Sequence, residues 1–422
     1  MRNIHKDART LIDRAIEANM PRKAVRNALE NHTFTGNIYL LAIGKAAWTM
    51  AHSAWEIMGS NISKGIVITK YGHSMGEIPH IEIIEAGHPL SDENTVAGTQ
   101  KAVDLAQSLG ENDELLFFVS GGGSALFELP LPGLGLDEII DVNRKLLTSG
   151  ADIVEVNMIR KRLSAVKGGR FAQICAPAKI FTVALSDVLG DRLDSIASGP
   201  AAPDMSTTEE ALSVIKKYNL TVSGKAMEYL HQETPNILDN AKTVITGSVR
   251  ALCESAADIA AELGYTPHIL CTDMDCEARE AGRLAASLAR QIDGSVYSFK
   301  RPCAIIMGGE TVVTVKGSGK GGRNQELALA AAEGIAGMDN TVVFSVGSDG
   351  TDGPTDAAGG IVDGGTFRRL TESGLSPRAA LENNDAYNAL AVVDGLIITG
   401  PTGTNVNDLT AILCRHEVTD AY

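Results

Sequence analysis

Apolar residues along the chain follow two alternating patterns, short runs and longer segments with helical spacing. Residues 6–30 have apolar positions three and four apart, and Pro21 divides them, so we expect two helices there. Further helices in the first half are predicted at 46–58, 95–109, 137–147 and 155–163. The charged spacing of 155–163 is typical of a surface helix.

Short runs rich in apolar residues predict strands that are covered on both faces, as in parallel sheets. In the first half they lie at 38–43, 66–69, 81–85, 115–119 and 180–185. In the second half, strands are predicted near Thr243 and at 267–271, 304–307, 311–315, 342–346 and 396–399, with helices at 249–263, 277–292, from Gln325 and at 377–391. This alternation predicts an α/β fold with a largely parallel sheet.

The chain is longer than one ordinary domain. Its 422 residues predict two or three domains, and the polar segment 233–242 is the best candidate for a boundary. We therefore expect an N-terminal α/β domain at 1–238 and a C-terminal α/β domain at 239–422. Whether the last strand returns to the first domain is left open.

Charge and composition narrow the class of protein. A net charge of −15 argues against nucleic acid or an anionic membrane as the main partner, but a local basic pocket for a small anion is compatible with it. The N-terminus is charged where a secretory signal would be apolar, and no apolar run reaches the length of a membrane span. Six cysteines without Cys-x-x-Cys spacing are expected to be reduced thiols of a cytoplasmic protein, and a homo-oligomer is left open.

The first candidate site is the loop Ser120-Gly121-Gly122-Gly123-Ser124, which follows the predicted strand 115–119. Glycines let backbone N–H groups approach a ligand, so this loop can bind phosphate or carboxylate oxygens. A tight strand-to-helix turn explains the same residues equally well. The pattern does not fit a serine-hydrolase elbow, because Leu126 stands where the last glycine would be.

Two cationic residues follow glycines at other strand-to-helix junctions. Lys45 comes after Gly44, where a helix start favours an anion, but the surrounding residues do not form a Walker A loop. Arg323 and Asn324 follow the glycine-rich segment 317–322, and an arginine there can bind a carboxylate or phosphate through two hydrogen bonds. The alternatives are an exposed lysine and a solvated helix start.

Acidic residues follow further strands. Asp187 and Asp191 leave the predicted strand 180–185, at the edge where α/β proteins bind ligands. Two carboxylates there suit Mg²⁺ coordination or proton acceptance, although turn formation also favours aspartate. Asp349 belongs to a loop dense in acids and glycine that lacks the spacing of a calcium-binding EF-hand. His73 and His88, each next to a glycine, are candidates for acid/base groups, but two isolated histidines more often serve as local hydrogen-bonding residues.

Together these signals predict phosphoryl transfer. The reaction needs backbone and cationic groups for the phosphate charge, acids for Mg²⁺, and an acid that orients the attacking hydroxyl. A dinucleotide site at Gly317–Gly322 is less well supported, because no acidic residue ends the next strand.

Several long motifs, taken together and in order, resemble those of type II glycerate kinases, the glycerate 2-kinase family with a C-terminal MOFRL domain. These motifs are Ala42–Trp48, Ser120–Ser124, Lys167–Arg170, Ser186–Asp194, Gly308–Thr311, Gly321–Leu327, Asp349–Asp356, Asn383–Asn388 and Thr399–Asn405. The resemblance covers essentially the whole chain.

The resemblance implies a Rossmann-like N-terminal domain with a doubly wound, mostly parallel sheet, an α/β MOFRL domain, and an active site in the cleft between them. It implies phosphorylation of D-glycerate on its 2-hydroxyl by ATP with Mg²⁺, giving 2-phosphoglycerate. Lys45, Asp187 and Arg323 occupy the positions of active-site residues in that family.

Within this reading Lys45 is expected to bind phosphate charge, and Arg323 the substrate carboxylate or the transferring phosphoryl group. Asp187 would orient the hydroxyl or bind Mg²⁺ with support from Asp191, and the glycine loop, Asn324 and Asp349 would contact substrate or phosphate. Two alternatives stay open: an NAD(P)H-dependent hydroxypyruvate reductase, a label that family members have carried, and a non-catalytic sugar-acid binding protein.

Overall fold

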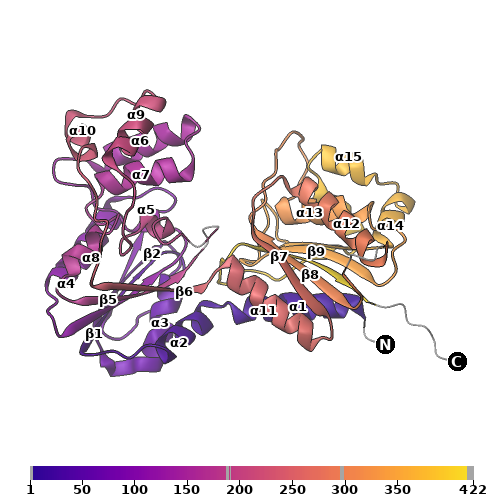
Figure 1. Cartoon of the computed structure of the whole chain (residues 1–422), viewed down its shortest axis with the longest axis horizontal. Helices are drawn as coiled ribbons and strands as arrows, with labels where there is room; N and C mark the ends of the chain where they lie inside the picture. Colours follow the sequence, from indigo (N-terminus) through magenta and orange to yellow (C-terminus); the bar gives the residue numbers. More distant parts are fainter. Residues whose placement is uncertain (1–2, 187–189, 191, 295–298, 416–422) are drawn as a thin grey trace. The chain divides into compact units, whose positions relative to one another are not determined.

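The computed structural model describes residues 3–186, 190, 192–294 and 299–415 (Figure 1). The chain forms two compact units, which are described separately below. The inserted unit comprises Pro21–Thr246, and the terminal unit combines Met1–Met20 with Gly247–Tyr422. These bounds differ from the domains expected at 1–238 and 239–422, because the first helix belongs with the second half of the chain.

The inserted unit is built on a six-stranded sheet with the order β3-β2-β1-β4-β5-β6. Its strands are β1 (Asn37–Ile43), β2 (Ile62–Lys70), β3 (Ile81–Ala86), β4 (Asp113–Val119), β5 (Lys179–Leu185) and β6 (Ala241–Gly247). The first five pair in parallel. This is the strand order of a Rossmann-like doubly wound fold, so the predicted class is confirmed for this unit.

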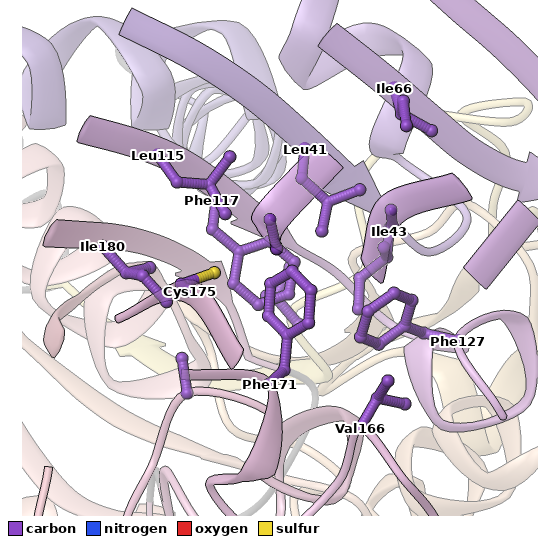
Figure 2. Packing of buried hydrophobic residues seen from close by; sticks show 14 of the residues in the cluster. Leu41, Ile43, Ile66, Leu115, Phe117, Phe127, Val166, Phe171, Cys175 and Ile180 are labelled. Carbon is purple, nitrogen blue, oxygen red and sulfur yellow. The ribbon is translucent and has the colours of Figure 1, made fainter. Parts of the chain in front are cut away.

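Helices cover both faces of this sheet because its strands are apolar on both sides. On one face lie α2 (Pro21–Glu30) and α3 (Ala47–Met58), and on the other α4 (Glu93–Gln107) and α8 (Arg170–Cys175). Along β4, Phe117 points to the second face and Phe118 to the first. Figure 2 shows the second face, where the rings of Phe117 and Phe127 pack against Phe171 with centroids 5.4 and 5.1 Å away.

Four further helices of the inserted unit form a separate helical cluster, grouped on one side of the sheet in Figure 1. They are α6 (Leu136–Thr148), α7 (Ile153–Leu163), α9 (Thr208–Lys217) and α10 (Gly224–Leu230). Their shared core includes Leu146, Val156, Ile159 and Leu230. The short helix α5 (Gly123–Leu126) and the 3₁₀ turn Ile196–Ser198 lie beside each other near the sheet end of this cluster.

The terminal unit contains a second six-stranded sheet, with the order β11-β10-β9-β12-β8-β7. Its strands are β7 (Thr266–Met274), β8 (Cys303–Gly309), β9 (Thr341–Gly347), β10 (Gly359–Asp363), β11 (Leu396–Ile397) and β12 (Asp408–Cys414). Only β7 and β8 pair in parallel, whereas β12 lies antiparallel between β8 and β9. The expectation of a largely parallel sheet is therefore wrong here, and the last strand stays in this unit.

Helices of the terminal unit are α1 (Ile4–Ala18), α11 (Val249–Glu262), α12 (Ala278–Gly294), α13 (Arg323–Ala332), α14 (Thr366–Glu372), α15 (Pro377–Glu382) and α16 (Ala386–Val392). The helix α1 contacts α11 and β9. Asp7 of α1 accepts hydrogen bonds from Tyr265 and Arg415, which ties the start of the chain to its second half.

Most predicted elements are present, but three predictions need correction. Residues 311–315 form no strand and make only a single bridge, between Val312 and Glu277. The strand predicted at 396–399 is limited to Leu396–Ile397. Helix α7 is not a surface helix, because Lys161 and Arg162 are 3% and 0% exposed. None of the six cysteines forms a disulfide, and no helix of the described residues is long and apolar enough to cross a membrane.

Candidate active site

The candidate site of the inserted unit lies at the carboxyl ends of β1 and β4. These neighbouring strands mark the point where the strand order reverses, which is where open α/β sheets bind ligands. The loops that follow them are joined directly: the N–H of Lys45 donates to the carbonyl of Gly121 at 2.9 Å, and the N–H of Ser120 donates to the carbonyl of Ile43 at 3.0 Å. The structure thus brings Lys45 and the loop Ser120–Ser124 together.

The two serines of this loop have different partners. The Ser120 hydroxyl donates to the carbonyl of Ile43 and accepts from the N–H of Ala46, both at 3.1 Å, so it holds the two loops together. The Ser124 hydroxyl lies 3.1 Å from that of Ser198, which donates to Asn157. Both hydroxyls are therefore engaged within the protein, and the backbone is the part of the loop best suited to a ligand.

Gly122 must be glycine for a specific reason. Its φ is +84°, and a Cβ atom there would lie 2.9 Å from Cδ2 of His88 and 3.4 Å from Cγ of Lys45. The loop backbone is thus in direct contact with two basic side chains. Lys45 is exposed, and its ammonium makes no ion pair or hydrogen bond with a described residue.

His88 belongs to a group of basic side chains at this edge of the sheet. Burial lowers the pKa of its imidazole, and the positive charges of Lys45, Lys70 and His73 lower it further. The positive charges of Lys45 and Lys70, on a protein with a net charge of −15, favour binding of an anion, whereas the lowered pKa of His88 favours its neutral imidazole. The sequence interpretation treated both histidines as local hydrogen-bonding residues and missed this grouping.

A cavity of about 680 Å³, called here the α6–α7 cavity, opens beside the glycine loop within the inserted unit. Its lining combines the loop with aliphatic side chains of helices α6 and α7 and a few polar groups. The lining residues include Leu90, Glu128, Ile139, Asn143, Leu147, Ile153, Asn157 and Arg160.

Glu128 and Arg160 are two of the charged residues that line this cavity. Glu128 is 3% exposed, and its Oε2 forms a 2.9 Å ion pair with the fully buried Lys167. Its other oxygen, Oε1, is buried and has no hydrogen-bond partner among the described residues. Arg160 donates from Nε to Asn143 at 3.0 Å. Burial lowers the pKa of Arg160, while the charge of Glu128 opposes this shift.

In the terminal unit, Arg323 is held by two carboxylates. It begins α13 and donates from Nε and Nη2 to the two oxygens of Asp408, at 2.6 and 3.0 Å. Its Nη1 lies 3.1 Å from Glu310. Burial alone would lower the pKa of Arg323, but the hydrogen bonds and charge of Asp408 outweigh it and raise that pKa.

The first turn of α13 is capped by Asp352. The backbone N–H groups of Asn324 and Gln325 donate to its two oxygens at 3.2 and 2.9 Å. Burial nevertheless raises the pKa of Asp352 to about 6. The side chain of Asn324 is buried and accepts a hydrogen bond from Ser345, so its position next to Arg323 is fixed from inside.

Asp349 is the remaining predicted site residue that the structure describes. Asp349 lies in a turn, where its Oδ1 accepts from the N–H of Thr351 at 2.9 Å. Asp187 and Asp191 lie outside the described residues, so their roles stay predictions.

Comparison with known proteins extends these observations to the whole chain. Residues 7–231 match the family model described as a domain of unknown function (DUF4147), and residues 303–408 match the MOFRL family. A D-glycerate 2-kinase of Thermotoga maritima is 52% identical over 407 residues, which cover 96% of this chain and 97% of that protein. The chain belongs to the glycerate 2-kinase family.

Two further relatives agree with this membership of the glycerate 2-kinase family. A glycerate 2-kinase of Pyrococcus horikoshii is 38% identical over 425 residues, covering 94% of both chains. The crystal structure of a glycerate kinase from Thermotoga maritima superposes with a TM-score of 0.93 at 52% identity and covers 97% of this chain and 99% of its own.

Four residues of the two sites in this glycerate 2-kinase family member were not predicted from the sequence: Asp352, Asp408, Glu128 and Arg160. Asp408 and Asp352 organise the start of α13, yet they stand in polar segments that read as loops. Glu128 and Arg160 belong to no motif. Only burial distinguishes Glu128 from a surface acid, and burial of a charged residue is not visible in one sequence.

Proposed function

We propose that this protein transfers the γ-phosphoryl group of ATP to the 2-hydroxyl of D-glycerate, giving 2-phosphoglycerate and ADP. The identity of 52% to a D-glycerate 2-kinase over nearly the whole length of both chains is the observation that carries this proposal. The glycine loop at the switch point, with Lys45 and His88 beside it, supports phosphate chemistry independently.

In the proposed reaction the hydroxyl oxygen of glycerate forms a bond to the γ-phosphorus, and the bond from that phosphorus to the ADP oxygen breaks. The loop backbone at Gly121 and Gly122 and the ammonium of Lys45 neutralise charge on the phosphate oxygens. Because Lys45 has no partner among the described residues, it is free to follow this charge. Asp187 orients the hydroxyl and accepts its proton in one form of this proposal, and binds Mg²⁺ with Asp191 in the other.

Arg323 is assigned to the substrate carboxylate or the moving phosphoryl group. Asp408 fixes the guanidinium plane through two hydrogen bonds, so the arginine is pre-organised for a planar anion. Asn324 stays a proposed substrate-contact residue, although its backbone N–H donates to Asp352 and its side-chain oxygen accepts from Ser345. Asp349 keeps a proposed role at the phosphate end.

Mg²⁺ supplies charge neutralisation between the phosphates when it is bound. Kinases hold this ion with one or two carboxylates together with substrate phosphates, so a cage of protein ligands is not required. The described residues hold no group of three or more His, Cys, Asp or Glu side chains suited to a metal. Asp187 and Asp191 are the carboxylates we propose for it.

Incubation with D-glycerate, ATP and Mg²⁺ tests the proposal when the product is identified by phosphorus NMR. We expect a 2-phosphoglycerate signal that requires all three components. A 3-phosphoglycerate signal would overturn the assigned position, and no phosphoglycerate would overturn the kinase. Oxidation of NADH or NADPH with hydroxypyruvate in the absence of ATP would favour the reductase instead.

A further inference from the structure

We propose that the α6–α7 cavity binds the nucleoside part of the phosphoryl donor, with its phosphates at the glycine loop. This inference rests on the proposed function and assigns the nucleotide to one side of the inserted unit. The cavity shares the loop Ser120–Ser124 as one of its walls, so a ligand that fills it reaches the switch point of the sheet.

The size and walls of the cavity fit a nucleoside better than a hydroxy acid. At about 680 Å³ it lies within the range of about 300–1,000 Å³ in which pockets bury cofactor-sized ligands. Leu90, Leu147 and Ile153 line it and are 64%, 56% and 58% exposed, although all three are large aliphatic residues. Exposed aliphatic groups gathered around a pocket mark a binding site for an apolar surface. D-Glycerate has no such surface, whereas a nucleobase has two flat apolar faces.

The polar corner of the cavity fits a ribose. Oε1 of Glu128 is a buried carboxylate oxygen in the cavity wall without a donor among the described residues. A buried acceptor of this kind is stabilised by a ligand that donates a hydrogen bond, and ribose has two neighbouring hydroxyls that do so.

Arg160 supplies the opposite charge in the same wall. Its Nε is held by Asn143, and the hydrogen bonds of the described residues leave its two Nη atoms without an acceptor. A guanidinium fixed at one nitrogen and free at the others is suited to phosphate oxygens. Glu128, Arg160 and the glycine loop line the same cavity, so one wall offers an acceptor for a hydroxyl and donors for phosphate oxygens.

Two neighbouring residues at the start of α7 allow a matched test. Ile153 lines the cavity, whereas Val154 is also exposed, at 38%, but does not line it. Both follow the N-cap Asp152 in the first turn, where asparagine is tolerated and carries no charge that would repel a nucleotide. Leu147 at the end of α6 offers a second position on the cavity wall.

The experiment measures the Kd of ADP with Mg²⁺ by isothermal titration calorimetry on the full chain. We expect the double variant Leu147→Asn/Ile153→Asn to weaken ADP binding about tenfold or more, since two aliphatic contacts are lost. Val154→Asn should bind ADP as the wild type does. The KM for D-glycerate should change less than twofold in both proteins.

An unchanged Kd of ADP in the double variant would overturn the inference, and so would a wild type that does not bind ADP. A raised KM for D-glycerate with unchanged ADP binding would assign the cavity to the hydroxy acid instead. Because calorimetry needs no turnover, tight ADP binding that the double variant loses supports this inference even if no 2-phosphoglycerate is formed, a result that would count against the proposed function alone.

Discussion

Arg323 donates hydrogen bonds to both carboxylate oxygens of Asp408, at 2.6 Å from Nε and 3.0 Å from Nη2. Asp408 is 4% exposed and opens β12, the strand inserted between β8 and β9. The arginine that family resemblance assigns to the active site is therefore also the partner of a buried charge. Its removal is expected to affect stability and catalysis together.

Arg323→Gln should lower the free energy of unfolding by about 3–5 kcal/mol, because it leaves Asp408 buried without its counter-charge. Urea unfolding of the wild type and variant measures the change. The control is the double variant Arg323→Gln/Asp408→Asn, which should recover part of the lost stability but none of the lost kcat/KM. A single variant as stable as the wild type would contradict this account.

Lys45→Ala should lower catalytic activity without lowering stability. Its side chain is exposed and has no partner among the described residues, so the melting temperature should stay within about 1–2 °C of the wild type. If Lys45 stabilises charge in the transition state, kcat/KM should fall on the order of 10²-fold. Lys64→Ala, an exposed lysine near the start of β2, is the control and should keep full activity. Near-normal kinetics in Lys45→Ala would remove this residue from the mechanism.

Gly122→Ala should weaken ATP binding in addition to the loss of stability that backbone strain causes. The new Cβ would lie 2.9 Å from Cδ2 of His88, so the loop or the imidazole has to move. Gly264→Ala provides the comparison, since Gly264 has a similar φ of +87° but nothing within 4 Å of its Cβ position. Both variants should lose about 1–3 kcal/mol from strain. Only Gly122→Ala should raise the KM for ATP, by about tenfold, and equal KM values would disprove the link between this glycine and the phosphates.

Asp352 should make stability fall as the pH rises. Burial raises its pKa from the ordinary 3.8 to about 6 in the folded protein, so the folded state holds the proton more tightly. The contribution of the protonated Asp352 carboxyl to the stability of the folded state is complete below about pH 4 and is lost between about pH 4 and 6. The difference in the free energy of unfolding between the wild type and Asp352→Asn, measured with urea, should therefore decrease from about pH 4 to pH 6 and stay constant above about pH 6. If this difference in the free energy of unfolding increased with pH, the fold would instead stabilise the charged carboxylate of Asp352.

Elements and loops that depend on residues close together in the chain could be predicted from the sequence. Apolar runs such as 38–43 and 115–119 are strands, and the glycine loop and Lys45 do meet at one edge of the sheet. Parallel strands covered by helices leave a strong pattern, and the loops at their carboxyl ends follow from it. The switch point could thus be anticipated from one sequence.

Features that depend on partners distant in the chain could not be anticipated. The charged residues of α7 read as solvent-exposed, yet Lys161 pairs with Asp194 and Asp204 at 3.0 and 3.2 Å. The pairing direction of β12 depends on which strands it lies between, and no local pattern encodes this. The α6–α7 cavity likewise arises from helices packed against a distant loop.

The packing of α1 against α11 and β9 has a consequence for the order of folding during synthesis. This amphipathic helix leaves the ribosome before the inserted unit, whereas α11 begins only at Val249, after the entire inserted unit has been made. At about 5–20 residues per second, its apolar face waits on the order of ten seconds or more for its partner. The inserted unit has its own sheet and core and is complete in that interval, so the nascent chain holds one finished unit while the first helix is still unpaired.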